Sequence, residues 1–335
     1  MKRAFYILFS LIILISCESE NELEGVWIGA YQVHYSGDEP LLSSMRLLLD
    51  ISKAELIYKT FDYPMFEERD SVQILKYSFN GKSLTLDSDT FLVKNLTKDS
   101  LVLNFCSNYE RDLVFKRLPD NNNFKIDIKN KAFSLTGPNY ADSIDFINDS
   151  LMLHIGNVFN TNYRSTKWAI NSYKSFDFLV FDQSESPPFL IDYSFENEIF
   201  LKLFFTTIKD FKMTNIENVK DTSGIIGNWV CPFQNRQGVP LPRHLEGVDS
   251  KLYLRVKSDS LEIEQYGKIK SKKWKLNSTN NFIYFPEKIN TKNGVWKILE
   301  VNEDKLIIER YRRNRKSYNP GDKEVIKFEK IKNSR

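Results

Sequence analysis

The residue types best suited to nucleophilic or metal chemistry are few in this sequence and lie far apart. The three histidines, His34, His154 and His244, are separated by 120 and 90 residues. Zinc sites and hydrolytic centres normally show ligands or local motifs at characteristic spacings. The sequence contains no Gly-x-Gly-x-x-Gly, P-loop, His-Glu-x-x-His, Cys-x-x-Cys or Gly-x-Ser-x-Gly motif. We therefore predict no cofactor, no metal centre and no catalytic residue.

Cys17 is the residue whose surroundings indicate a covalent modification. It follows Lys2, Arg3 and an apolar segment of about 12 residues, which is too short to cross a bilayer and fits the apolar region of a signal peptide. The run Leu14-Ile15-Ser16-Cys17 resembles the lipobox of bacterial lipoproteins. The resemblance implies cleavage before Cys17, a diacylglycerol thioether on its sulfur, and usually an acyl chain such as palmitate on the new amine.

The predicted lipid sets the location of the protein. Two or three acyl chains anchor a protein stably, whereas one chain binds only marginally. Residues 1–16 would be the signal peptide and the acidic segment 17–22 a tether. We predict a lipid-anchored protein of the cell envelope, in the outer membrane rather than the inner, facing the periplasm or the surface. An ordinary secretory signal with an incidental cysteine is the alternative.

Two further cysteines, Cys106 and Cys231, remain after cleavage. The envelope is oxidising and permits a disulfide. The two residues fall in different parts of the predicted architecture, so we favour two buried thiols that act as small apolar side chains.

The elements that must position these residues are short strands. Phe (25 residues) and Tyr (16) are abundant, and apolar and polar residues alternate between turns, as in Leu252, Leu254 and Val256 against Tyr253 and Arg255. About eight such runs fill each of the ranges 23–118 and 224–332, and a looser set fills 123–217. We predict an all-β fold of three consecutive small antiparallel barrels, or barrel-like sheets, of about eight strands each. Three β-sandwiches are the competing architecture.

A Gly-x-Trp sequence opens the first and last of these ranges, as "GVWIG" at 25–29 and "GNWVC" at 227–231. Together with a final strand that ends in a basic residue, it resembles the lipocalin and calycin pattern. The resemblance implies that Trp27 and Trp229 close the floor of a barrel and that a basic side chain lies over each ring. The candidates for that side chain are Arg117 in the first range and Lys327 or Lys330 in the last.

A turn recurs in all three ranges, as "KDSLVL" at 98–103, "NDSLML" at 148–153 and "SDSLEI" at 258–263. Asp and Ser favour tight turns, and we expect the following leucine to enter the barrel side of the next strand. The middle range has Phe133 where the outer ranges have tryptophan, which leaves the closure of that barrel open.

Charge is unevenly distributed along the chain. Residues 18–223 carry 21 basic and 31 acidic side chains, whereas residues 224–335 carry 24 and 13. A basic patch in "RYRRNRK" could bind an anionic envelope component such as a lipid headgroup, a lipopolysaccharide phosphate or an acidic protein face. A solvated hairpin, or a hairpin docked on the acidic part of the same chain, is the alternative. Nucleic acid is disfavoured as a partner by the predicted compartment, and the sequence lacks an RNA- or DNA-binding signature. The patch comprises Arg310, Arg312, Arg313, Arg315 and Lys316.

Three functions are compatible with these observations. The leading hypothesis is a membrane-anchored envelope lipoprotein that binds a small hydrophobic ligand or an envelope partner without catalysis. The second is a structural or assembly subunit whose barrels are filled by their own side chains. The third is an envelope hydrolase. An apolar interior with an open end favours the first, and filled interiors favour the second.

The lipid anchor can be tested directly. Replacement of Cys17 with alanine in a host that processes lipoproteins should move the protein from the detergent phase to the aqueous phase, because no thioether can form. Partition in Triton X-114 and mass spectrometry of the N-terminal peptide measure this. A variant that still partitions into detergent after cleavage at the same place would show that the assignment is wrong.

Overall fold

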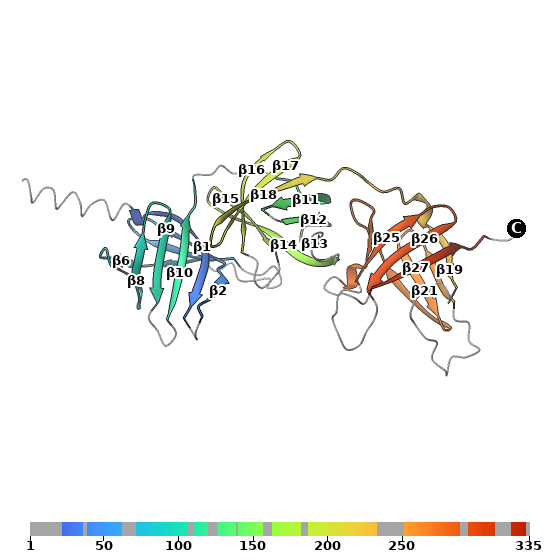
Figure 1. The fold of residues 1–335 in the computed structure, drawn as a ribbon, viewed down its shortest axis with the longest axis horizontal. Coiled ribbons are helices and arrows are strands. Elements are labelled where there is room, and N and C mark those ends of the chain that lie inside the picture. Colours follow the sequence, from blue (N-terminus) through green and yellow to red (C-terminus); the bar gives the residue numbers. More distant parts are fainter. Residues whose placement is uncertain are drawn as a thin grey trace, which may run out of the picture. The chain divides into compact units, whose positions relative to one another are not determined.

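The computed structural model describes residues 22–35, 39–61, 72–105, 110–119, 126–138, 140–156, 163–181, 187–232, 251–288, 294–311 and 323–332. Within these ranges the prediction of three barrel-like antiparallel sheets is confirmed (Figure 1). The predicted signal peptide and Cys17 lie outside the described residues. No helix in the described part of the chain has the length and apolarity needed to cross a membrane.

The first sheet has ten strands in the order β5-β4-β3-β1-β10-β9-β8-β7-β6, and β2 also pairs with β1. Its edge strands β5 and β6 are consecutive in sequence and separated only by Lys76, so the sheet is nearly closed. The strands are β1 (Gly25–His34), β2 (Leu41–Ser44), β3 (Leu47–Ile51), β4 (Leu56–Thr60), β5 (Val72–Leu75), β6 (Tyr77–Phe79), β7 (Ser83–Leu86), β8 (Asp89–Leu96), β9 (Ser100–Phe105) and β10 (Arg111–Arg117).

The middle sheet is the one that closes completely, although its sequence pattern is the loosest. Phe133, at the place of the missing tryptophan, is buried and packs edge-to-face on Phe146 with ring centroids 5.8 Å apart. The barrel is β11 (Lys131–Gly137), β12 (Tyr140–Phe146), β13 (Leu151–Gly156), β14 (Tyr163–Tyr173), β15 (Phe176–Phe181), β16 (Phe189–Phe195), β17 (Glu198–Phe204) and β18 (Ile208–Asn215).

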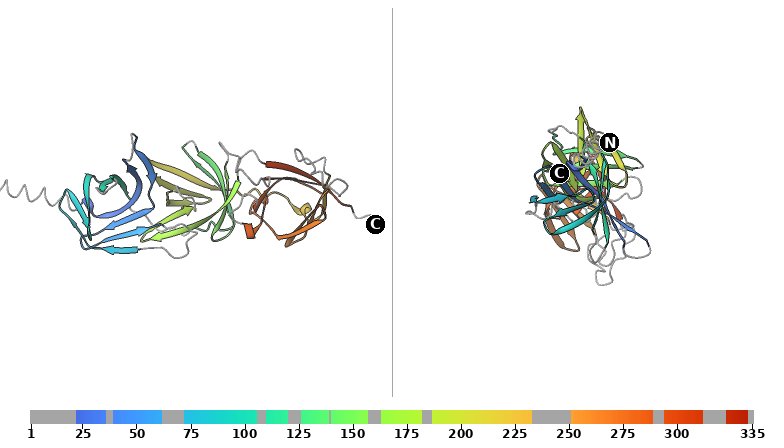
Figure 2. Two further views of the ribbon diagram at one scale, coloured as in Figure 1. Left: turned by 90° about the horizontal axis from the view of Figure 1, so that it is seen from below. Right: turned by 90° about the vertical axis from the view of Figure 1, so that its left-hand side faces the viewer.

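The third sheet repeats the plan of the first. Its nine strands run in the order β22-β21-β20-β19-β27-β26-β25-β24-β23, and Trp274 alone separates the edge strands β22 and β23. The curl of this orange-to-red sheet is seen in the left view of Figure 2. Its elements are η1 (Ser223–Ile225), β19 (Gly227–Cys231), β20 (Leu252–Val256), β21 (Ser260–Gln265), β22 (Lys268–Lys273), β23 (Lys275–Leu276), β24 (Phe282–Tyr284), η4 (Pro286–Lys288), β25 (Val295–Val301), β26 (Lys305–Tyr311) and β27 (Lys323–Lys330).

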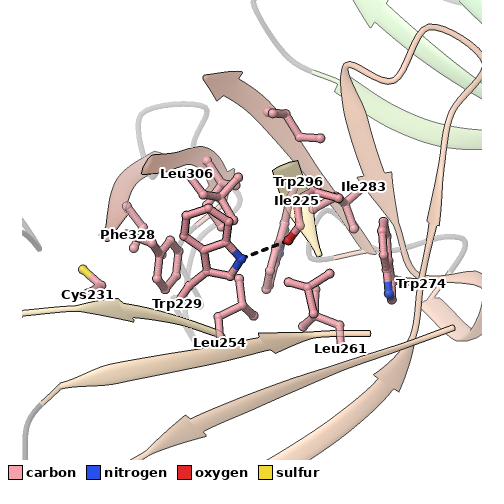
Figure 3. Packing of buried hydrophobic residues seen from close by; sticks show 14 of the residues in the cluster. Ile225, Trp229, Cys231, Leu254, Leu261, Trp274, Ile283, Trp296, Leu306 and Phe328 are labelled. Atoms are coloured by element: carbon pink, nitrogen blue, oxygen red, sulfur yellow. Dashed lines mark hydrogen bonds between the residues drawn. The ribbon is translucent and has the colours of Figure 1, made fainter. Parts of the chain in front are cut away.

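The Gly-x-Trp sequence has the same structural role in both outer sheets. Trp27 and Trp229 are fully buried, and each indole N–H donates to a carbonyl oxygen four residues earlier at 2.9 Å, on Leu23 and Ile225 respectively. Figure 3 shows the bond from Trp229 to Ile225. Arg117 lies over the Trp27 ring at 4.1 Å, and Lys330 lies over the Trp229 ring at 5.0 Å. Of the two lysines that the sequence left open, Lys330 is therefore the one above the ring.

The glycine two residues before each tryptophan makes room for the cation. Gly25 has φ +136° and Gly227 has φ +145°, a region that side chains rarely adopt. A Cβ atom at Gly25 would collide with the Arg117 guanidinium, and one at Gly227 would come within 2.9 Å of Lys330 Cε. The glycine, the tryptophan and the basic residue are therefore parts of one arrangement.

The recurrent Asp-Ser-Leu turn is used in two ways. Leu101 and Leu261 enter the cores of the first and third sheets, as expected. Leu151 does not enter the middle barrel, because it packs in a cluster with Phe282 and Tyr284 of the third sheet. The expectation that the leucine always enters its own barrel is wrong for this turn.

The chain forms two compact units, residues 1–125 with 168–211 and residues 126–167 with 212–335. In the first unit, Ile28 and Leu48 on the outer face of the first sheet share a core with Phe178 and Leu190 of the middle barrel. A buried Asp50 accepts a hydrogen bond of 2.6 Å from the Tyr173 hydroxyl and also contacts the Lys174 ammonium.

In the second unit a buried carboxylate joins β12 to the segment between β23 and β24. Asp145 accepts hydrogen bonds from Asn277 Nδ2 at 2.6 Å and from Ser278 Oγ at 2.8 Å. Burial raises the pKa of Asp145, and these hydrogen bonds oppose the shift. The buried Asp145 carboxylate therefore has a structural role, because its hydrogen bonds join β12 to the third sheet.

Replacement of Trp27 with alanine should destabilise the first sheet by about 3–5 kcal/mol, because a large buried ring and its cation contact are both lost. Hydrogen exchange of peptides from residues 25–117 in the full mature chain would localise the effect. Ile74→Ala, on an exposed position of the same sheet, is the control and should change stability by less than about 0.5 kcal/mol. Equal exchange in the two variants would contradict the structural role of Trp27.

Candidate ligand site at the end of the first sheet opposite Trp27

Strand β10 places two arginines on the inner face of the first sheet, one at each end. Leu113 and Phe115 belong to the interior core, and side chains alternate along a strand, so Arg111 and Arg117 face the same interior. Six residues at about 3.3 Å each put their Cα atoms roughly 20 Å apart. The two guanidinium groups differ in how their hydrogen-bonding groups are satisfied.

Each of the three guanidinium nitrogens of Arg117 has a backbone acceptor at the tryptophan end. Its Nε donates to the Lys98 carbonyl at 2.6 Å, and its two terminal nitrogens donate to the carbonyls of Glu24 and Glu22. Its face lies on Trp27. This end of the sheet is therefore closed by side chains of the chain itself.

Arg111 at the opposite end has no such set. Its guanidinium lies over the Phe105 ring at 5.2 Å, and the Phe105 ring contacts Phe91 at a centroid distance of 5.2 Å. The Nε atom is buried and has no hydrogen-bond partner, and among the residues that the structure describes no carboxylate forms an ion pair with this side chain. A buried donor left unsatisfied costs about 1–3 kcal/mol.

Tyr58 brings a second polar group to this interior. It lies directly opposite Leu49 on β3, a core residue, and packs on the same core. Burial raises the pKa of Tyr58, and the nearby Arg111 charge acts in the opposite direction. Within the described ranges the Tyr58 hydroxyl has no hydrogen-bond partner.

The rim of the same end carries further hydrogen-bonding groups. His34 pairs directly with Arg111 across β1 and β10, and its Nε2 lies 3.3 Å from Ser43 Oγ. No inward-facing Asp or Glu lies at this end in the part of the chain that the structure describes, and no group of three or more metal-binding side chains occurs there. The described residues of this end therefore offer hydrogen-bond donors to a bound acceptor.

A second polar cluster on β10 lies on the outer face of the sheet and is satisfied internally. Asp112 accepts hydrogen bonds from Asn104 at 2.6 Å, Tyr35 at 2.7 Å and Lys94 at 3.0 Å. Burial by itself would raise the pKa of Asp112, but these hydrogen bonds outweigh it and the pKa is lowered. The cluster stabilises the strands that it joins and leaves the Asp112 carboxylate occupied.

The third sheet contains a related cation in a neutralised form. Arg310 Nε donates to Glu324 Oε1 at 2.7 Å, and the guanidinium lies over Trp296 at 5.2 Å. Arg310 is therefore paired inside the sheet, which corrects its assignment to an exposed basic patch. The other members of that patch, Arg312, Arg313, Arg315 and Lys316, lie outside the described residues.

Lysines at alternate positions of β22 add positive charge to the third sheet. Lys268 and Lys270 are exposed, and Lys272 lies over the Phe285 ring at 4.5 Å. Strand β22 is an edge strand, and lysines on edge strands prevent pairing with other chains. Protection of the sheet edge explains the lysines of β22, so no bound ligand is needed to explain their charge.

The remaining chemically interesting residues are dispersed. His154 and Asp142 form a hydrogen bond of 2.7 Å between β13 and β12 of the middle barrel. Cys231 is a buried cysteine in the third sheet, whereas Cys106 and His244 lie outside the described residues. The structure thus brings His34 to the candidate site and leaves His154 in a different barrel.

Sequence reasoning missed Arg111 and Tyr58. One signal was present, because "RDLVFKR" places two arginines at positions of the same parity around apolar residues. The parity shows that both face one side, but it does not show which of them has hydrogen-bond partners.

No protein-family model and no curated protein matches this sequence. Among solved structures, the vaccine antigen Transferrin Binding Protein B (TbpB) from Haemophilus parasuis aligns with a TM-score of 0.18 and 9% identity, over 92% of this chain and 76% of that one. The Helicobacter pylori beta clamp in complex with Carprofen aligns with a TM-score of 0.16 and 8% identity, over 90% and 91% of the two chains. Scores this low carry no argument about family or function.

The difference between the two arginines predicts different effects of their substitution on stability. Arg117→Met should destabilise the first sheet by about 2–4 kcal/mol, because three carbonyl oxygens lose a charged donor and the indole loses its cation. Arg111→Met should leave stability unchanged or raise it, because an unsatisfied buried donor is removed. Denaturant midpoints of the ligand-free protein compare the pair, and equal losses would contradict the distinction.

Proposed function

We propose that this protein is a lipid-anchored envelope protein that binds a small hydrophobic ligand, without catalysis, within its first sheet. The observation that supports the proposal is the contrast between the two ends of that sheet. One end is closed by Trp27 and by Arg117, whose three nitrogens all donate to backbone carbonyls, whereas the other presents aromatic rings beside donors of Arg111 and Tyr58 that have no partner among the described residues. Binding sites for small molecules combine an apolar lining with a few polar groups that orient the ligand.

A structural role is the better proposal for the third sheet. Trp229, Trp274 and Trp296 are all buried in one cluster of its interior (Figure 3), and its inward arginine is neutralised by Glu324. Because side chains of the protein fill this interior, any partner of the third sheet would bind to its outer surface. We propose that the third sheet, together with the strands of the middle barrel in the same unit, has a structural role and binds no small molecule in its interior.

The uncharged fluorophore N-phenyl-1-naphthylamine tests the binding function without any contribution from charge. We expect saturable binding to the delipidated soluble protein carrying Cys17→Ala. Leu113→Trp adds bulk to the interior beside Arg111 and should weaken binding at least about tenfold, which corresponds to about 1.4 kcal/mol.

Leu92→Trp is the matched control, since it adds the same bulk to an exposed position of the same sheet. It should leave the affinity unchanged. Circular dichroism establishes that both variants are folded. Absence of saturable binding, or equal weakening by the two substitutions, would refute a ligand site inside the first sheet.

A further inference from the structure

A buried carboxylate lies in the contact between the middle barrel and the third sheet. On one side this contact comprises β12 and β13, and on the other it comprises residues 277–284 of the third sheet. We propose that the contact is a pH-dependent joint, which is closed when Asp145 is protonated and opens when Asp145 loses its proton. Such a joint would act whether or not a ligand is bound elsewhere in the chain.

Asp145 is completely buried, and its two oxygens have different surroundings. Its Oδ2 accepts hydrogen bonds from Asn277 Nδ2 at 2.6 Å, from Ser278 Oγ at 2.8 Å and from Ser278 N at 3.2 Å. Its Oδ1 is also buried and has no hydrogen-bond partner in the part of the chain that the structure describes. A proton on Oδ1 therefore removes the charge from the contact and leaves all three hydrogen bonds to Oδ2 in place.

The protonated form is favoured when the joint is closed. Burial raises the pKa of Asp145, and the hydrogen bonds from Ser278 and Asn277 oppose only part of this shift. When the joint opens, water reaches the carboxylate and its pKa returns towards about 3.9, the value of an exposed aspartate. The contribution of Asp145 to closure is therefore fully present below about pH 4 and is lost as the pH rises through the raised pKa of the closed state.

No described cation neutralises Asp145 from the elements packed around it. Strands β11 and β13 place the apolar residues Ala132 and Leu153 directly opposite Asp145. The Lys220 ammonium donates to two backbone carbonyls of β25 at 2.9 Å. Burial and the charge of Asp145 raise the pKa of Tyr284 to about 12, so its hydroxyl stays neutral. The other charged or titratable groups on the facing surfaces are Lys167 on β14, Lys297 on β25, Glu309 and Tyr311 on β26, and Lys323 on β27.

The corresponding contact in the other unit has a cation. Asp50 is buried where the first sheet packs on the middle barrel, and it accepts a hydrogen bond of 2.6 Å from the Tyr173 hydroxyl. The Lys174 ammonium also contacts it and neutralises its charge. Asp145 has no ion-pair partner within the described ranges, so the two contacts should respond differently to pH.

A second unsatisfied group lies at the same contact. Ser165 on β14 is directly opposite Leu153, which belongs to the apolar cluster of the contact. The Ser165 Oγ is buried and has no hydrogen-bond partner among the residues that the structure describes. Buried polar atoms without partners weaken a contact. Opening would expose Ser165 Oγ and Asp145 Oδ1 to water, which satisfies both.

Hydrogen exchange of the full soluble chain carrying Cys17→Ala measures the joint between about pH 4 and about pH 8, the range above the pKa of an exposed aspartate. Peptides covering 143–153 and 277–284 report on the joint, and peptides covering 47–51 and 173–178 report on the Asp50 contact. After correction for intrinsic exchange rates, protection of the joint peptides should fall by up to about tenfold per pH unit, because opening releases one proton. Protection at the Asp50 contact should not show this fall.

Two variants assign the effect to Asp145. Asp145→Asn keeps an oxygen for the donors of Ser278 and Asn277 and carries no charge, so its joint should stay closed over the whole range. Asp149→Asn is the matched control, because it removes one carboxylate from an exposed position of the same hairpin, and it should behave like the wild type. All other titratable groups are common to the proteins compared, so the difference between them reports on Asp145.

Equal pH dependence in the wild type and in Asp145→Asn would overturn the proposal. Protection that rises with pH would also overturn it, because Asp145 would then be ionised in the closed contact. If Asp145→Asn does not fold, the wild type alone decides, and equal responses of the Asp145 and Asp50 contacts would show that no pH-dependent joint exists. These measurements use no ligand, so their outcome is independent of the binding function proposed for the first sheet.

Discussion

The contact between a cation and a buried indole organises both outer sheets. Trp27 lies beneath Arg117 and Trp229 beneath Lys330, and each contact requires a glycine two residues before the tryptophan. The arrangement ties the start of the first strand to the end of the last strand in each sheet, where the pairs Trp27–Arg117 and Trp229–Lys330 lie opposite each other. It therefore holds the first and last strands of each outer sheet side by side in the middle of that sheet. The two unpaired edges of each sheet then lie elsewhere, at β5 and β6 in the first sheet and at β22 and β23 in the third.

Closure of one end has a consequence for the other end of the first sheet. The backbone carbonyls that satisfy Arg117 come from segments at the tryptophan end, so they cannot reach a cation roughly 20 Å away on the same strand. Arg111 rests on an aromatic ring with its Nε buried and unpaired. In the third sheet, Glu324 occupies the inner face beside Arg310 and removes the corresponding charge. Two sheets with one plan thus differ in whether a described residue of the chain neutralises their interior cation.

The middle barrel shows that closure does not depend on tryptophan. Phe133 and Phe146 pack inside it, while its outer face contributes to cores shared with the neighbouring sheets in each unit, through Phe178 in the first and Leu151 in the second. Residues that face out of a barrel are normally polar, and here they are apolar because they are covered. Burial of both faces explains why apolar and polar residues alternate only weakly in this part of the sequence. It also explains why we expected Leu151 inside the barrel, whereas it lies on the outer face.

Sequence alone determined the class of fold and the two plugs, because strand alternation and a Gly-x-Trp with a distant basic residue are local or strongly patterned signals. Arg111 and Arg117 also stand at positions of equal parity in the sequence, a signal that our predictions did not use. Which of these arginines has partners was decided only by tertiary structure, since the satisfying carbonyls of Glu22, Glu24 and Lys98 come from other segments. The same holds for Arg310, which a run of basic residues suggested as exposed and which Glu324 neutralises across two strands. Hydrogen-bond satisfaction depends on contacts between distant segments, and a linear pattern does not record them.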